Sequence, residues 1–274
     1  MVPGLSIAWM LVSLFVSFGL PLGLLIVLQR RFRASLMPAL AGALIFVAFA
    51  MVFESSIGSA LLVASPGLQR AVSSGGAAYG LYAGLMAGLF EETGRLCAFL
   101  FLTQSARGKN DVSTALSYGV GHGGIESILL VGMTYLSNLM VSISVNQHGV
   151  DALLDASGLD AAAREIQRGM IEVLVNTPSF DFLAGGIERI ITIAVHIALS
   201  VLVWMAVTRR GSLWMYPLAI LLHAALNFPA GLYRFGIIRS AWLIELVVLL
   251  IGAGICLLTC RLYRGPRAVR PAGG

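Results

Sequence analysis

The chain has 274 residues, of which 58% are hydrophobic and only 11% are charged, with a net charge of +5 and a mean hydropathy of +0.90. About a quarter of the residues in a soluble globular domain are charged, so this chain has too little polar surface to fold in water. The basic residues stand in short groups beside apolar runs, which is typical of membrane topology signals and not of a phosphate-binding surface. We therefore expect a multi-pass protein of the cell membrane that contacts lipid and does not bind nucleic acid.

The first apolar run continues from Leu5 to Leu28 and meets the basic stretch 29–33. No basic segment precedes the run, and its length is that of a transmembrane helix and not of a cleavable signal peptide. Six further runs of similar length follow. The sequence thus predicts an all-α bundle with seven spans, over residues 5–28, 35–57, 78–103, 114–143, 181–207, 213–233 and 240–262. Residues 1–262 would form a single transmembrane domain, and residues 263–274 a basic cytoplasmic tail.

The connections between these spans predict the orientation. Eleven lysine and arginine residues lie on one side and five on the other, which places the N-terminus outside and the C-terminus inside. Residues 146–180 are polar and predict an extramembrane loop with an amphipathic helix over Asp160–Val175, whereas residues 58–77 read as an interfacial segment. The three cysteines lie within apolar runs and predict no disulfide framework.

Ionisable residues inside the spans are the main functional signal. A charge at the bilayer centre costs at least about 2.5–3.5 kcal/mol, so such residues are candidates for function. Glu54 and Glu245 stand singly, and we interpret both as structural. Spans three to six carry the remaining polar set: Glu91, Glu92, Arg95, His122, Glu126, Glu188, Arg189, His196, His223 and Asn227.

Helical spacing groups this set. Residues four apart share a helix face, so His122 lies with Glu126 and His223 lies with Asn227, while Arg95 is within reach of Glu91 and of Glu92. Counted from the predicted cytoplasmic ends, Glu91 is 12 residues deep, His122 eight, His196 about 11 and His223 ten. At 1.5 Å per residue these depths are all about 12–18 Å. Four helices therefore place acids or imidazoles in one layer.

Glycines support convergence of these helices. Gly76, Gly80, Gly84 and Gly88 form a stripe at four-residue spacing that leads to Glu92, and such stripes allow helix backbones to approach closely. Four more glycines lie between residues 119 and 124, around His122. They predict a thin and irregular helix beside a water pocket.

The residue types suit peptide hydrolysis, which needs a base for water, a stabiliser for the oxyanion and an acid for the leaving amine. The sequence has no GxSxG or HExxH motif and no pair of intramembrane aspartates. His122, His196 and His223 could instead bind zinc, with glutamate as a further ligand. A glutamate-activated water and a metal-activated water both remain open.

These motifs resemble the YhfC family of intramembrane proteases, which is similar to the CAAX prenyl proteases and bacteriocin-processing enzymes and to the PrsW-type proteases. The motifs are Glu91–Arg95, Gly121–Glu126, Glu188–Arg189 through His196, and His223 with Asn227. The resemblance implies that Glu91 activates water, that His122 and His223 stabilise the transition state or act as acid, and that Asn227 helps to form the oxyanion site. Arg95 follows Glu92 by three residues instead of four, which leaves the division of roles between Glu91 and Glu92 open. Arg95, Glu126, Glu188 and His196 would support the site.

The predicted function is that of an intramembrane endopeptidase that cleaves a membrane-embedded or lipid-linked peptide. A transporter or proton relay could use the same carboxylates and histidines, and a non-catalytic scaffold or immunity protein is a third possibility. Each motif also has a structural interpretation, as an ion pair or a hydrogen-bonded histidine that joins two helices. The substrate and the oligomeric state cannot be read from the sequence.

Overall fold

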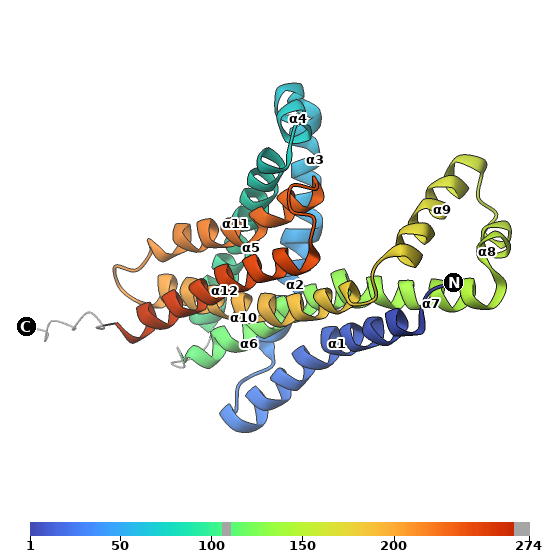
Figure 1. The fold of residues 1–274 in the computed structure, drawn as a ribbon. Coiled ribbons are helices and arrows are strands. Elements are labelled where there is room, and N and C mark those ends of the chain that lie inside the picture. Colours follow the sequence, from blue (N-terminus) through green and yellow to red (C-terminus); the bar gives the residue numbers. More distant parts are fainter. Residues whose placement is uncertain (106–110, 266–274) are drawn as a thin grey trace, which may run out of the picture. The chain divides into compact units, whose positions relative to one another are not determined.

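A computed structural model describes residues 1–105 and 111–265, and every regular element in these ranges is helical (Figure 1). The chain divides into two compact units, which we describe separately. The first contains residues 1–20 and 127–190, and the second contains residues 21–126 and those from 191 onward. The single domain expected over 1–262 stays a prediction. The expected tail and four of the basic residues counted for the orientation, at 107, 109, 267 and 270, lie outside the described ranges.

In the first unit, two hydrogen bonds join the N-terminal segment of the chain to a later helix. It contains the first part of α1 (Gly4–Phe32), the π-helical segment η2 (Ser127–Gly132), α7 (Met133–His148), α8 (Val150–Ala156), α9 (Ala161–Asn176) and the start of α10 (Asp181–Thr208). The Asn146 side chain accepts a hydrogen bond from Val2 N (2.7 Å) and donates one to Val2 O (2.9 Å). Met10, Leu139 and Phe182 are part of the apolar core that joins α1, α7 and α10.

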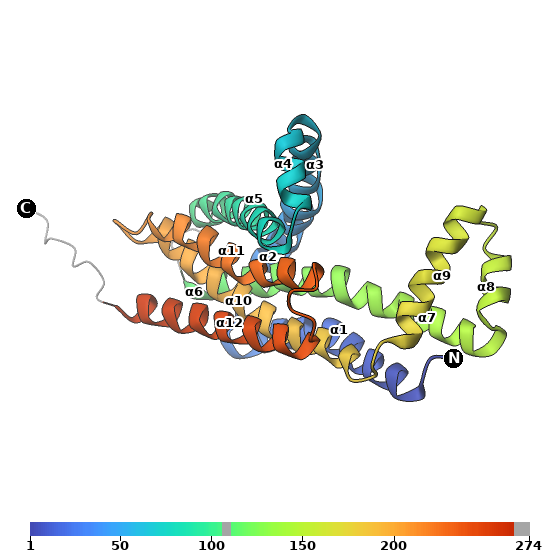
Figure 2. The ribbon, with the colours of Figure 1, turned by 45° about the horizontal axis from the view of Figure 1, so that its top comes forward.

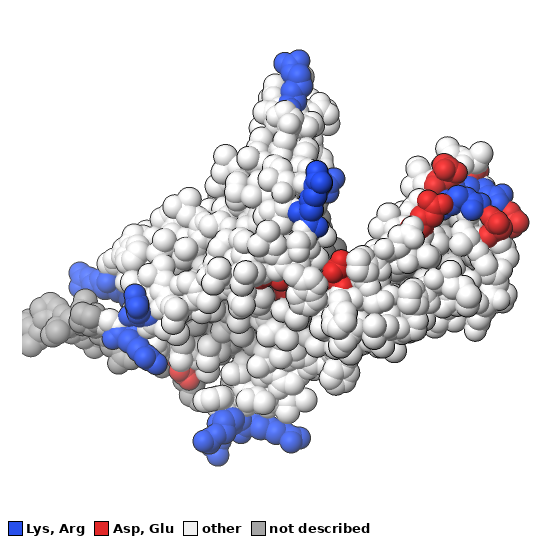
Figure 3. Space-filling model, in the orientation of Figure 1, with Lys and Arg blue, Asp and Glu red and all other residues white. Residues whose placement is uncertain are grey.

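The predicted amphipathic helix in the loop is α9, and it begins and ends within one residue of the expected bounds. The Asp160 carboxylate caps it by accepting a hydrogen bond from Ala163 N at 2.8 Å. Its apolar residues Ile171 and Leu174 are buried, the first of them in a small core with Leu154 of α8. Figures 1 and 2 both show α8 and α9 beyond the end of α7, and Figure 3 shows acidic and basic side chains gathered over these two helices on an otherwise mostly uncharged surface.

The second unit carries the rest of the chain. Its elements are the second part of α1, α2 (Met37–Ile45), η1 (Phe46–Glu54, π-helical), α3 (Ser55–Ala64), α4 (Pro66–Ser73), α5 (Gly76–Ser105), α6 (Val112–Glu126), most of α10, α11 (Met215–Arg234) and α12 (Ala241–Arg264). The segment expected to be interfacial is therefore helical. The second span continues as α3 to Ala64, Pro66 begins the short helix α4 because proline is favoured in the first turn, and Figures 1 and 2 show α3 and α4 side by side.

Six helices in the described residues are long and apolar enough to cross a membrane, and seven spans were predicted. The difference is α5, the predicted third span, in which Glu91, Glu92, Arg95 and several glycines lower the mean hydropathy. With 30 residues, α5 is about 45 Å long, which exceeds the thickness of the hydrocarbon core. The fold is thus a multi-pass helical membrane protein, while its orientation remains a prediction.

The glycine stripe of α5 packs along α11, as expected. A Cβ atom placed on Gly80, Gly84 or Gly88 would lie 2.5 to 2.6 Å from a backbone oxygen of α11, closer than any side chain tolerates. The glycines around His122 likewise allow α6 to pack closely against its neighbouring helices. Gly121 contacts the backbone of Ala39 in α2, and Gly119 contacts α10 at Ile197. The predicted irregularity at His122 is wrong in position, because α6 stays regular to Glu126 and the π-helical segment follows it.

Candidate active site

Four helices of the second unit, α5, α6, α10 and α11, bring the predicted acids and histidines together. The close packing of α5 against α11 places Glu92 beside His223, and the packing of α6 against α10 places His122 beside His196. The side chains of Glu92, Arg95 and His122 are fully buried, and those of Glu91, His196 and His223 nearly so. The structure therefore brings the acids and histidines predicted to share one depth into a contiguous cluster.

Glu92 is fixed by a cation and an imidazole. Arg95 Nη1 donates to both carboxylate oxygens, at 2.5 Å to Oε1 and 2.6 Å to Oε2. His223 Nδ1 donates to the same Oε1 at 2.7 Å. Because Nδ1 of His223 carries the proton of this bond, its Nε2 is left with a lone pair in the neutral ring.

Glu91 lies between two imidazoles and has no arginine partner. Its Oε2 is 2.8 Å from His122 Nε2, and its Oε1 is 3.8 Å from His223 Nε2. The other ring nitrogen of His122, Nδ1, is buried and has no hydrogen-bond partner among the described residues. The two adjacent glutamates thus stand in different environments, one neutralised by a cation and the other facing imidazole nitrogens.

His196 extends the cluster to α6. Arg95 Nη2 lies 3.0 Å from His196 Nδ1, which must be the acceptor because a guanidinium group only donates. The proton then sits on Nε2, which lies 2.6 Å from Glu126 Oε2. Both nitrogens of His196 are therefore engaged, and its orientation is set from both sides.

Aromatic rings enclose the imidazoles. Tyr118 stacks on His122 with ring centroids 5.9 Å apart, and Phe46 meets the same imidazole edge-on at 5.3 Å. The three histidine rings also lie next to one another, with centroids 4.9 Å apart for His122 and His196 and 5.4 Å for His196 and His223. Such an enclosure lowers the local dielectric constant, so the charged contacts inside it are stronger than they would be in water.

The donor atoms of Glu91, His122 and His196 lie within 4.8 Å of one another, which makes them a candidate metal group. A carboxylate with two imidazoles is a ligand set that zinc takes in hydrolytic enzymes. The unpartnered Nδ1 of His122 and the free lone pair of His223 Nε2 are what such a site requires, and the hydrogen bond from His223 to Glu92 matches the carboxylate partner that metal-binding histidines usually have. The residues are therefore compatible with a metal such as zinc.

Two predicted site residues do not join the cluster through a described contact. Asn227 lies one turn after His223 on α11 and is half-buried, but its side chain makes no hydrogen bond within the described ranges. Glu188 belongs to the first unit, where it pairs with Arg189 at 2.6 Å. The roles assigned to both residues stay predictions. The enclosing Phe46 gave no signal in the sequence, because one apolar residue in an apolar span carries no pattern.

Comparison with known proteins assigns the family. Residues 16–248 match the family described as YhfC intramembrane metalloprotease. The chain is 37% identical over 248 residues to an uncharacterized membrane protein YhfC of Bacillus subtilis (strain 168), an alignment that covers 90% of this chain and 93% of that protein. No solved structure matches the chain. With the family match covering most of the chain and a relative of this similarity, the protein belongs to the YhfC intramembrane metalloprotease family.

Proposed function

We propose that the protein is a metal-dependent endopeptidase that cleaves a peptide within or at the surface of the membrane, with Glu91 as the reacting carboxylate. The observation that carries the proposal is the asymmetry of the two adjacent glutamates. Arg95 neutralises Glu92, whereas Glu91 faces His122 and His223. A carboxylate that is already bound by a guanidinium group is a poor proton acceptor, so Glu91 is the better base.

The proposed ligands are Glu91 and His122, with a second imidazole from His223, or from His196 once its Nδ1 releases Arg95. A bound zinc ion would polarise the scissile carbonyl and make a bound water acidic enough to attack at neutral pH. Glu91 has one oxygen toward each neighbouring histidine, so one oxygen would hold the metal while the other would accept the proton that the attacking water loses. When His196 is the second ligand, His223 Nε2, 3.8 Å from Oε1, is free to pass that proton to the leaving amine.

The other polar residues position these groups. Glu92 holds His223 through Nδ1, which fixes the tautomer that leaves Nε2 toward Glu91. Arg95 binds both Glu92 and His196, so a single cation sets the orientation of two imidazoles on two different helices. Glu126 completes the support through its carboxylate, whose Oε2 lies 2.6 Å from His196 Nε2.

The same contacts weigh against a proton relay. The polar contacts run from Glu126 through His196, Arg95 and Glu92 to His223. Arginine does not release its proton in proteins, so a chain of transfers would stop at Arg95. The cluster is better suited to hold charges in place than to conduct protons.

The test is cleavage by the purified protein in lipid nanodiscs, using a library of fluorescent apolar peptides. Glu91→Gln should lower cleavage by about 10²–10⁴-fold, the usual contribution of a positioned base. Glu172→Gln, which alters an exposed carboxylate on α9, should cleave like the wild type. A zinc chelator should abolish cleavage and added zinc should restore it, with metal content measured by mass spectrometry.

Each outcome bears on a separate part of the proposal. Wild-type cleavage by Glu91→Gln would overturn the role of Glu91. Cleavage that resists the chelator and occurs in metal-free protein would overturn the metal while leaving the peptidase. An absence of cleavage together with proton or solute flux into liposomes would favour a transporter.

A further inference from the structure

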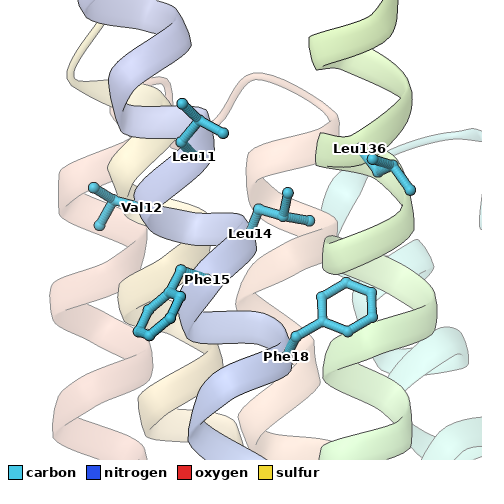
Figure 4. A pocket seen from close by; sticks show the side chains of 6 residues that line it. All are labelled: Leu11, Val12, Leu14, Phe15, Phe18 and Leu136. Atoms are coloured by element: carbon cyan, nitrogen blue, oxygen red, sulfur yellow. The ribbon is translucent and has the colours of Figure 1, made fainter.

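Two cavities among the described residues differ strongly in chemistry. The first lies in the first unit and has a volume of about 720 Å³. Figure 4 shows its lining, which is apolar throughout: Leu11, Val12, Leu14, Phe15 and Phe18 of α1 with Leu136 of α7. A surface of this kind offers dispersion contacts only and cannot select one polar ligand over another.

The second cavity lies in the second unit, among the end of η1, α3, α4 and α5, and has a volume of about 240 Å³. It is lined by one carboxylate, four hydroxyl groups and several apolar side chains, of which Glu54, Ser55, Ser59, Tyr79, Tyr82 and Met86 carry the argument. A water molecule takes up about 30 Å³, so the cavity has room for about eight waters. It is smaller than pockets for drug-sized ligands and matches a single long amino-acid side chain.

The cavity adjoins the candidate active site. Met86 in its wall precedes Glu91 on α5 by five residues, which corresponds to about 7.5 Å along the helix axis. The Glu54 carboxylate lies close enough to Glu91 and His223 to interact electrostatically with both. One bound molecule could therefore reach both Glu54 and Glu91.

Glu54 makes no hydrogen bond or ion pair among the described side chains, although it stands in a predicted membrane span and is half-buried. The walls beside it are fixed, because Tyr82 Oη donates a hydrogen bond to Gly58 O at 2.9 Å. Gly58 packs closely against the same side chain, since a Cβ atom there would lie 3.2 Å from Tyr82 Oη. Glu54 itself ends the π-helical segment η1, and π-helical turns are frequent at functional sites. A lone carboxylate at membrane depth without a partner is costly unless a ligand supplies one.

We propose that this cavity is a substrate subsite in which Glu54 binds the basic side chain, lysine or arginine, of the peptide that reacts at Glu91. The carboxylate would accept a charge-assisted hydrogen bond from the ammonium or guanidinium group, and the serine and tyrosine hydroxyls would take up its remaining donors. The aliphatic stem of the side chain would lie along Met86 and the apolar wall. This inference rests on the proposed peptidase function, and it replaces the structural role expected for Glu54 from the sequence.

The first experiment measures binding without cleavage. Glu91→Gln protein in nanodiscs is titrated with fluorescent leucine-rich peptides that carry a single lysine, arginine, norleucine or glutamate at a scanned position. At one position the basic peptides should bind at least about tenfold more tightly than the norleucine peptide, the scale of one charge-assisted hydrogen bond. Adding Glu54→Gln should bring that ratio to about one, whereas adding Glu172→Gln should leave it unchanged.

Two further variants guard against a misfolded Glu54→Gln protein. Glu54→Asp keeps the charge and should keep part of the preference, and Glu54→Lys should favour the glutamate peptide. Nanodiscs with and without an aminophospholipid test whether a lipid headgroup occupies the subsite, since the headgroup would then compete with the basic peptide. Competition of that kind, or a basic preference that survives Glu54→Gln, would overturn the subsite.

The second experiment repeats the comparison by cleavage with Glu91 intact, so that the two proposals can fail separately. Loss of the basic preference in Glu54→Gln with cleavage by the wild type supports both. A preference in binding without cleavage by the wild type would retain the subsite and reject the peptidase. Cleavage that is indifferent to lysine, arginine or norleucine at every position would retain the peptidase and reject the subsite.

Discussion

Two arginine–carboxylate pairs of this protein stand in opposite environments. Arg95 and Glu92 are both fully buried on α5, whereas the Arg168 and Asp151 side chains are 37% and 81% exposed on α9 and α8. An exposed pair exchanges one hydrated state for another and contributes little, but a buried pair cannot lose one partner without leaving a charge in a low-dielectric environment. The same kind of ion pair therefore contributes little in the exposed loop, whereas in the buried cluster the structure around it depends on both partners.

Removal of the buried cation should have the largest effect. Arg95→Met leaves Glu92 buried without its cation, which should cost about 3–5 kcal/mol of stability and abolish cleavage. Reversible unfolding in mixed micelles measures the first effect. The double variant Glu92→Gln/Arg95→Met should recover much of the stability but not the cleavage, because His223 loses its carboxylate partner. Equal stability of Arg95→Met and the wild type would show that the pair does not organise the site.

A change in the helix packing that buries this pair should have the second-largest effect on stability. Gly84→Ala places a methyl group 2.6 Å from Ala224 O on α11, and the strain of such overpacking is about 1–3 kcal/mol. Gly254→Ala is the matched control, since a Cβ atom at Gly254 meets nothing within 4 Å. Unfolding of the two variants side by side should show a loss only for the first. A similar effect at both positions would point to the helix backbone and not to the contact between α5 and α11.

A smaller effect is expected from the edge of the cluster. Glu126→Gln keeps a polar side chain beside His196 Nε2 but removes its charge, and weakening one such polar contact corresponds to about 1 kcal/mol. Loss of the partner of a metal-binding histidine typically lowers metal affinity by about 10–100-fold. Competition with a chromogenic zinc chelator would measure this change. Unaltered zinc affinity would favour His223 over His196 as the second imidazole ligand.

Removal of the exposed pair should have the smallest effect on stability and on cleavage. Arg168→Ala removes the 2.7 Å contact with Asp151, and both Tm and the rate of cleavage should equal those of the wild type. Thermal denaturation and the peptide assay give the two comparisons. A large loss in this variant would contradict the distinction between the loop pairs and the buried pair.

Much of the fold follows from patterns that a single sequence contains. The spans are long apolar runs, and α9 has a capping aspartate before an amphipathic pattern, so both could be predicted. The four-residue glycine stripe on α5 predicted close packing without naming α11 as its partner. The π-helical segments η1 and η2 could not be predicted, because an added residue in a helical turn leaves no mark on an apolar sequence.

The sequence predicted which residues lie together better than it predicted which of them contact one another. Helical depth brought Glu91, Glu92, His122, His196 and His223 into one layer. Which glutamate meets Arg95 could not be read, because Arg95 lies between the two in angle and only the position of α11 decides it. Glu54 was assigned a structural role because it stands alone in its span, and the cavity that gives it neighbours is formed by three other segments.

The burial of α10 has a consequence for how the protein is made. This helix has the mean hydropathy of an independent span, 2.5, yet 67% of that segment is covered by protein. A helix of this kind can enter the bilayer alone and lose its lipid contacts afterwards, when the other helices close around it. His196 would then spend the interval in hydrocarbon without Arg95 or Glu126. Completion of the buried cluster should therefore be a late step of biogenesis, and a stalled chain that ends before α10 should already be inserted and still lack this cluster.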